Sequence, residues 1–194
     1  RYDLIGKIDD WVVKKTFSLL HEHPEFVNRI HFISINLSGP SLTDIALMET
    51  IMSLFRKYNI DPGKICFEVT ETVAISNLNA AISFMTMLKE IGCHFALDDF
   101  GSGLSSFAYL KNLPVDFLKI DGVFVKDITH DPVDYVMVKS INNIGQAMGM
   151  KTIAEFVETD EIMDILKIMG INYAQGYGVG KPQSFEQLLL KNME

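Results

Sequence analysis

Strand-like and helix-like segments alternate along the chain. Six short runs rich in β-branched and aromatic residues are typical of buried strands. Between them, apolar positions recur at helical spacing, as at Trp11, Val12, Phe17 and Leu20. The strands are predicted at residues 31–37, 64–70, 93–99, 115–121, 151–156 and 172–177. The helices are predicted at 8–22, 41–58, 77–91, 132–149 and 159–169, and a final helix is predicted after Pro182.

This alternation predicts a parallel sheet whose strands are joined by right-handed helical crossovers. Capping residues at 41–44 and a glycine at position 170 mark helix ends. No linker, low-complexity stretch or block of charge divides the chain, so residues 1–194 are predicted to form a single domain. An open doubly wound sheet and a (β/α)₈ barrel that lacks its first strands both fit this order.

Each predicted strand has a side chain with an amide, a carboxylate or an amine at its C-terminal end. These side chains, in chain order, are Asn36, Glu68, Asp98 with Asp99, Lys119 with Asp121, Glu155 and Gln175. In a parallel barrel these ends converge on one face, whereas an open sheet binds ligands only at a switch point. The pattern therefore favours an α/β fold of the TIM-like (β/α)₈ barrel type, of which about six strand–helix units are present.

Strand alternation selects the side chains expected to face the barrel axis. They are Asn36, Glu68, Asp98, Asp99 and Glu155, an all-oxygen set. Hard oxygen ligands favour Mg²⁺ or Mn²⁺ over zinc. Two divalent ions would neutralise four carboxylates, and a two-metal site suits the hydrolysis of a phosphodiester.

Structural roles are an alternative for each of these residues taken alone. A single carboxylate after a strand is most often a helix cap, and this favours such a supporting role for Glu71 and Glu158. Lys119 alone would form a salt bridge at the rim, and Gly101 and Gly103 would form a turn. Six coincident strand ends are poorly explained in this way, so a functional site is the preferred interpretation.

Composition restricts the possible binding partners of the protein and its expected cellular location. The formal net charge is −8 and no run of Lys or Arg extends beyond isolated pairs, which argues against binding of bulk nucleic acid. Cys66 and Cys93 lie inside apolar runs and are expected to be buried free thiols in a reducing compartment. No apolar stretch approaches the roughly 20 residues that span a bilayer, so we expect no membrane insertion by this segment and a cytoplasmic domain, which a membrane anchor elsewhere in the protein could tether.

Several motifs carry a specific resemblance to a known family. They are Asn36-Leu37-Ser38, Glu68-Val69-Thr70-Glu71, Asp98-Asp99-Phe100-Gly101-Ser102-Gly103, Lys119-Ile120-Asp121, Glu155-Phe156-Val157-Glu158 and Gln175-Gly176-Tyr177. In content and order this series resembles the signatures of EAL-domain cyclic di-GMP phosphodiesterases, from about Ile8 to Pro182.

The resemblance implies a barrel that hydrolyses cyclic di-GMP to linear pGpG with two Mg²⁺ or Mn²⁺ ions. By resemblance, Asn36, Glu68 and Asp98 hold one ion, and Asp98, Asp99 and Glu155 hold the second. Lys119 orients or polarises the attacking water, and Glu155 is also a candidate general base. The residues expected to support the site and its cofactor are Asp121, Gln175, Glu158 and Glu71. Of these, Glu71 would anchor the loop from Asp99 to Ser105, which couples metal binding to the contacts of a homodimer.

The chain departs from the family pattern at two places. The Glu-Ala-Leu motif, whose glutamate is a metal ligand, is absent, and the chain begins at Arg1 in a helical pattern. A barrel of roughly 250 residues would need about 50 further N-terminal residues, or a second chain to cover the gap. Phe156 stands where the family more commonly has glycine, and both flanking glutamates are retained.

Three functions follow from these features. The first is an active phosphodiesterase, whose activity is expected to depend on the glutamate that is missing from this fragment. The second is a catalytically inactive cyclic di-GMP receptor on the same fold, and the third is a structural barrel used for dimerisation. The retained carboxylates favour the enzyme. Family members often carry a GGDEF or sensory domain, which these residues neither require nor exclude.

Overall fold

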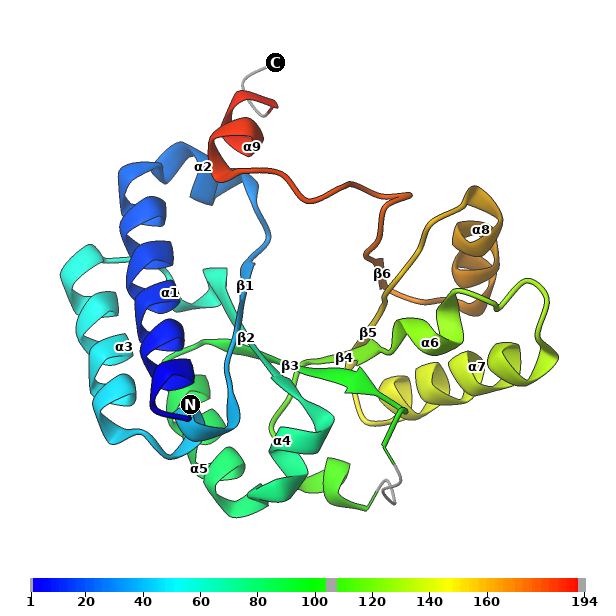
Figure 1. The fold of residues 1–194 in the computed structure, drawn as a ribbon, viewed down its shortest axis with the longest axis horizontal. Coiled ribbons are helices and arrows are strands. Elements are labelled where there is room, and N and C mark those ends of the chain that lie inside the picture. Colours follow the sequence, from blue (N-terminus) through cyan, green and yellow to red (C-terminus); the bar gives the residue numbers. More distant parts are fainter. Residues whose placement is uncertain (1, 104–107, 192–194) are drawn as a thin grey trace. The chain divides into compact units, whose positions relative to one another are not determined.

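The computed structural model describes residues 2–103 and 108–191 of the chain (Figure 1). The chain forms two compact units. The first contains residues 1–96 and 112–114, and the second contains residues 97–111 and 115–194.

The first unit is built on parallel strands with long buried side chains. Strand β1 (Ile33–Asn36) pairs in parallel with β2 (Ile65–Thr70), and the beginning of β3 (His94–Phe100) follows β2 in the sheet. Phe67 of β2 and Phe95 of β3 are both fully buried, with ring centroids 5.7 Å apart. Their burial explains why these runs are continuously apolar.

Helices cover these strands. They are α1 (Tyr2–Glu22), α2 (Pro24–Arg29), α3 (Ile45–Tyr58), α4 (Glu71–Ser76) and α5 (Leu78–Glu90), with 3₁₀ turns η1 (Gly39–Thr43) and η2 (Pro62–Lys64). Helix α1 packs beside α3, where Phe17 and Phe55 make an edge-to-face contact with centroids 4.8 Å apart (Figure 1). The Asp44 side chain caps α3 by accepting hydrogen bonds from the amides of Ala46 and Leu47.

A buried carboxylate ties α1 to the turn that follows β1. Oδ2 of Asp9 accepts hydrogen bonds from the Ser38 amide at 2.8 Å, the Ser38 hydroxyl at 2.6 Å and the Ser41 hydroxyl at 2.6 Å. Asp9 is only 8% exposed. Three donors satisfy this buried charge, so the network fixes the backbone directly after Asn36.

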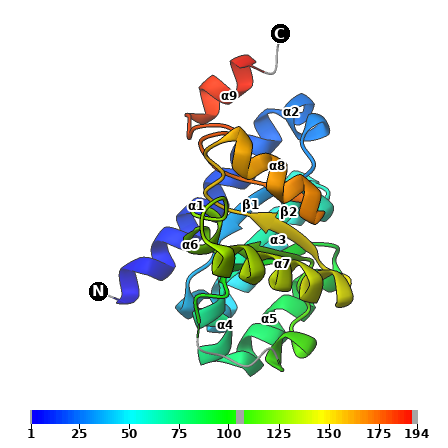
Figure 2. The ribbon, with the colours of Figure 1, turned by 90° about the vertical axis from the view of Figure 1, so that its right-hand side faces the viewer.

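The second unit is also built on parallel strands. The end of β3 is followed by the parallel strands β4 (Phe117–Ile120), β5 (Lys151–Ala154) and β6 (Tyr173–Ala174). Its helices are α6 (Gly122–Val125), α7 (Pro132–Ala147), α8 (Asp160–Met169) and α9 (Phe185–Lys191), and η3 (Tyr109–Asn112) leads into it. Helix α7 packs against β4 and β5 through a face that buries Val138 and Ile141 (Figure 2).

The six predicted strands are confirmed, and several boundaries differ. The predicted helix at 41–58 is a 3₁₀ turn followed by α3, because Asp44 interrupts the first segment as an N-cap. Strand β6 has two residues rather than six, and the backbone of Gly176 after it lies so close to the backbone of Val157 that a Cβ would overlap it. The short helices α2, α4 and α6 were not foreseen from periodicity, since segments of four to six residues carry little of it.

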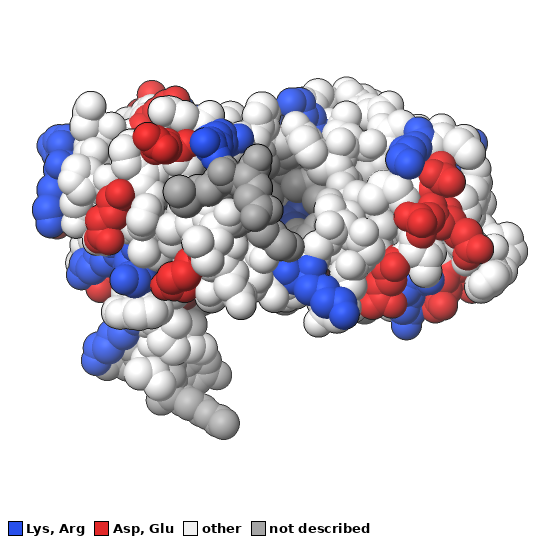
Figure 3. Space-filling model, turned by 90° about the horizontal axis from the view of Figure 1, so that it is seen from above, with Lys and Arg blue, Asp and Glu red and all other residues white. Residues whose placement is uncertain are grey.

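Cys66 and Cys93 are buried free cysteines, as predicted. Within residues 2–103 and 108–191, none of the helices has the length and apolar character needed to cross a membrane. On the face drawn in Figure 3, positive and negative side chains are interspersed.

Candidate active site

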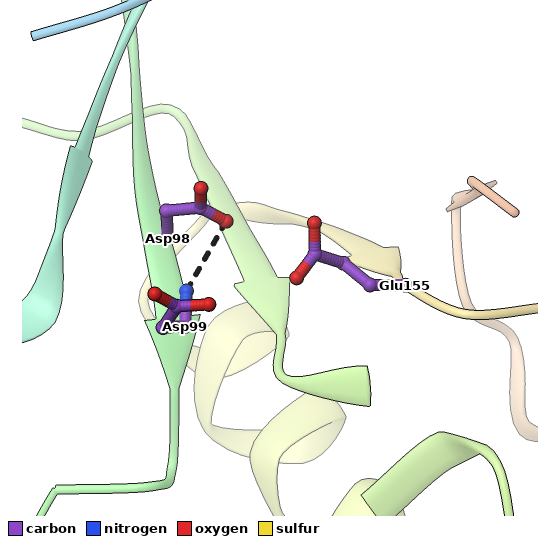
Figure 4. Close-up of side chains that lie close together, drawn as sticks. All are labelled: Asp98, Asp99 and Glu155. Atoms are coloured by element: carbon purple, nitrogen blue, oxygen red, sulfur yellow. Dashed lines mark hydrogen bonds between the residues drawn. The ribbon is translucent and has the colours of Figure 1, made fainter. Parts of the chain in front are cut away.

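Three carboxylates converge at strand ends of the second unit. Asp98 and Asp99 lie at the end of β3, and Glu155 follows directly after β5. One oxygen from each of the three lies within 4.8 Å of the others (Figure 4). The sequence predicted this grouping, and parallel strand direction explains it, because the C-terminal ends of neighbouring parallel strands lie on one side.

Asp98 and Asp99 reach the same cluster although they are consecutive residues. In a regular strand their side chains would point to opposite faces. Asp99 instead has a φ of 55°, in the left-handed region that aspartate tolerates better than most residues. The Asp99 amide donates to Oδ1 of Asp98 at 3.1 Å, which fixes the turn (Figure 4).

Lys119 is a buried cation between two of these carboxylates. Its Nζ lies 2.8 Å from Oδ1 of Asp98 and 2.9 Å from Oε1 of Glu155. Its side chain is 3% exposed, against 13% for each carboxylate. The alternative that Lys119 forms a salt bridge at the rim is therefore wrong, because β4 carries it into the interior.

The three carboxylates outnumber this one ammonium, and the pKa values of Glu155 and Asp99 are raised. Loss of solvation is the largest cause that raises the pKa of Glu155, and Asp98 and Asp99 raise it further while Lys119 lowers it. Desolvation also raises the pKa of Asp99, with Asp98 and Asp121 adding repulsion and Lys119 opposing them. Such a group of acids gains stability from a bound cation.

Asp121 and Glu158 are two of the residues that the sequence predicted to support the site. The Asp121 side chain accepts a hydrogen bond from the Val123 amide at 2.9 Å and so caps α6. Helix α8 is capped by Thr159, whose hydroxyl accepts from the Ile162 amide, so the expectation that Glu158 acts as a helix cap is wrong. Glu158 is exposed beside Glu155 and faces a cavity instead.

That cavity has a volume of about 350 Å³. It is lined by Glu155, Phe156, Glu158, Gln175, Gly176 and Tyr177. Gln175, which was predicted to support the site, thus lines the same cavity as Glu155. Phe156 and Tyr177 were not selected from the sequence as site residues, and the one signal for Phe156 was its occurrence where glycine is commoner.

The remaining predicted residues belong to the first unit. Asn36 and Glu68 are partners across the β1–β2 register, so these two predicted ligands lie on neighbouring strand ends. Glu68 is 6% exposed and Glu71 is 3% exposed. Glu71 begins α4 after the N-cap Thr70, so it is not the cap of that helix. Its predicted anchoring of the loop involves Ser105, which lies outside the described residues.

The donor set of the second unit fits a hard divalent cation. Asp98, Asp99 and Glu155 offer only oxygen ligands, with spacing that one ion can bridge. In the described part of the chain, no cysteine or histidine belongs to this group, and such residues would be expected at a zinc site. The fold and these residues define a class of protein, the (β/α)-barrel proteins with a cluster of carboxylates at the C-terminal ends of their strands.

Comparisons with known proteins identify the family. The EAL domain family model matches residues 1–182, and the chain belongs to this family. It is 46% identical over 183 residues to cyclic di-GMP phosphodiesterase PdeB of Shewanella oneidensis, covering 94% of this chain and 21% of that protein. It is 38% identical over 182 residues to cyclic di-GMP phosphodiesterase PdeF of Escherichia coli, covering 94% of this chain and 24% of that protein.

Solved structures give the same architecture. The EAL domain of Mycobacterium smegmatis DcpA superposes with a TM-score of 0.90 at 30% identity, covering 97% of this chain and 84% of that one. The PaMucR phosphodiesterase in its c-di-GMP complex gives 0.89 at 31% identity, covering 96% and 76%. The predicted α/β, TIM-like barrel fold is thereby confirmed. The chain spans about a quarter or less of the length of the curated relatives described above.

Proposed function

We propose that this chain is the catalytic domain of a metal-dependent phosphodiesterase that hydrolyses cyclic di-GMP to linear pGpG. The observation that carries the proposal is the cluster of Asp98, Asp99 and Glu155 around the buried Lys119. Relatives of this family are named cyclic di-GMP phosphodiesterases, and a related structure is described as a complex with c-di-GMP. An acidic oxygen cluster beside a buried ammonium supports hydrolysis better than a structural role.

Two Mg²⁺ or Mn²⁺ ions are the proposed cofactors. Asn36, Glu68 and Asp98 would hold one ion, and Asp98, Asp99 and Glu155 the other. When bound, the ions would supply Lewis acidity and would neutralise the charge that develops on a phosphodiester during hydrolysis. The raised pKa of Glu155 and of Asp99 without cations supports this assignment, because each bound ion would relieve the repulsion among these carboxylates.

The chain's own residues would bind and orient the reactants. The Lys119 ammonium, fixed by two carboxylates, would donate a hydrogen bond to the attacking water. Glu155 would accept a proton from that water, and its raised pKa suits this role. The water oxygen forms a bond to phosphorus, the bond from phosphorus to the 3′ oxygen breaks, and a proton passes to that oxygen. The product keeps a 5′-phosphate, as in pGpG.

The domain organisation, assembly and location of the protein are also part of the proposed function. Residues 1–194 would belong to one EAL-type barrel domain. A homodimer would be its functional form, and a GGDEF or sensory domain would supply the signal. A cytoplasmic location would give the site access to the second messenger.

The first test is turnover of cyclic di-GMP by the full-length protein with Mg²⁺ or Mn²⁺, beside Asp99→Asn. Asparagine has the same shape and tolerates the left-handed backbone of Asp99, so this variant should fold. We expect pGpG from the wild type and a loss of at least about a hundredfold in the variant. Tight binding of cyclic di-GMP without turnover would instead assign the protein to the receptor class.

A further inference from the structure

Asp9 is a buried acid in the middle of α1, and the function proposed above gives it no role. The three hydrogen bonds that its Oδ2 accepts come from Ser38 and Ser41, in the turn that follows β1. The next residue, Asp10, lies nearer the surface and pairs with Lys14 along the same helix. An apolar residue would fill the place of Asp9 without the cost of burying a charge, so the packing of α1 does not by itself require a carboxylate there.

Ser38 directs both of its hydrogen-bond donors at this carboxylate. It is the N-cap residue of η1, where a serine hydroxyl commonly accepts from an amide of the turn that it begins. Here the side chain makes no such capping bond, and the hydroxyl and the amide both donate to Asp9. The chain directly after β1 is therefore attached to α1 rather than to its own turn.

The same stretch of chain is attached to β2 on its other side. The amide of Leu37 donates to the carbonyl oxygen of Glu68 at 2.9 Å. Asn36, the last residue of β1, is the register partner of Glu68, and its side chain is exposed. Few packing contacts fix an exposed side chain, so its position depends on the backbone that carries it. That backbone is held at the next two residues, first by β2 and then by Asp9.

We propose that Asp9 is a positioning residue for the metal site. By holding Ser38 it fixes the end of β1, and so it sets where the Asn36 side chain stands relative to Glu68. This inference rests on the proposed function, in which Asn36 and Glu68 hold one cation. Hydrogen-bonded groups behind a metal ligand typically contribute about 10–100-fold to metal affinity. Asp9 acts through Ser38 and not by contact with the cation.

The test compares Asp9→Ala and Asp9→Asn with two controls in the full-length protein. Alanine removes the acceptor, whereas asparagine keeps the shape and offers a neutral oxygen with two lone pairs to three donors. Asp10→Asn is the matched control on the same helix, because it ends a surface pair with Lys14. Phe55→Leu is the control for stability, because it loosens the packing of α1 on α3 and leaves the turn after β1 unchanged.

Hydrogen exchange without metal reports directly on the end of β1. Mass spectrometry with fragmentation to single residues follows the Leu37 amide, which donates to Glu68 and not to Asp9. In Asp9→Ala this amide should exchange at least about tenfold faster relative to Phe67 in the middle of β2. Phe55→Leu should lower Tm and leave the ratio of the two rates unchanged. An unchanged ratio in Asp9→Ala would overturn the proposal, because the end of β1 would then be held without the carboxylate.

Binding of Mn²⁺, followed by electron paramagnetic resonance of the free ion, measures the site without turnover. Asp9→Ala should bind Mn²⁺ about tenfold more weakly, and the two controls should bind it as the wild type does. The Mn²⁺ concentration for half-maximal turnover should rise by the same factor, with a smaller change in KM for cyclic di-GMP. If Asp9→Ala does not fold, Asp9→Asn carries the same comparison, with a loss of at least about threefold.

The outcomes separate this inference from the proposed function. If the wild type turns over cyclic di-GMP and the Asp9 variants bind Mn²⁺ as tightly as it does, Asp9 is a structural residue only. The inference is then wrong, and the phosphodiesterase stands. If the wild type neither binds Mn²⁺ nor turns over cyclic di-GMP, the proposed function fails. The exchange rate of the Leu37 amide then still decides whether Asp9 holds the end of β1.

Discussion

Replacement of Lys119 by methionine is the most informative perturbation of the site. Methionine has a similar length and no charge, so the change removes the cation with little change of volume. Asp98 and Glu155 then lose partners at 2.8 and 2.9 Å in a place where each is 13% exposed. Breaking a buried ion pair from one side typically costs about 3–5 kcal/mol. We expect a loss of about 3 kcal/mol in the free energy of unfolding at pH 8, in buffer with a chelator.

The loss should depend on pH and on divalent cations. Lys119 lowers the pKa of Glu155, so its removal raises that pKa further above the unfolded value. A carboxyl with a raised folded pKa contributes stability below its unfolded pKa and loses this contribution as the pH rises through the folded value. The variant's deficit should therefore be largest at pH 8 and smaller near pH 5. Mg²⁺ should restore more stability to the variant than to the wild type.

Urea denaturation at both pH values, with and without Mg²⁺, measures these effects. Lys167→Met is the matched control, because Lys167 pairs with Asp164 at 3.0 Å with side chains 67% and 70% exposed. It should change stability by less than about 0.5 kcal/mol. A Lys119→Met variant within about 1 kcal/mol of the wild type at pH 8, or equally destabilised at both pH values, would refute the reasoning.

Three further predictions concern the framework of the site. Asp9→Ala should lower the free energy of unfolding by about 2 kcal/mol or more in urea titrations, because three hydrogen bonds to a buried carboxylate are lost. Gly101→Ala should cost about 1–3 kcal/mol in thermal denaturation, since its φ is 101° and a Cβ would lie 2.8 Å from Cδ1 of Ile141; an unchanged Tm would contradict this. Burial raises the pKa of the Cys93 thiol from 9.0 to about 12. The wild type should therefore lose stability as the pH rises from 9 through 12, by up to about 1.4 kcal/mol per pH unit, and Cys93→Ala should lack this slope.

The sequence predicted the order of the elements and the chemistry at the strand ends. Short apolar β-rich runs and helical stripes are local patterns, and they predicted six strands in the right places. Parallel direction then placed Asp98, Asp99 and Glu155 at one side of the sheet without knowledge of coordinates. The motifs from Asn36 to Gln175 gave the family, which the comparisons confirmed.

Only the tertiary structure revealed how these residues are held. The periodicity of apolar residues predicts helices and strands, but it contains no information on the backbone angles of one residue. The left-handed backbone of Asp99 and of Phe156 was therefore not predicted. The burial of Lys119 between two carboxylates and the packing of the Phe156 ring against Gly122 each join residues more than 20 positions apart. Such contacts depend on packing between distant segments, and a sequence read locally contains no measure of that distance.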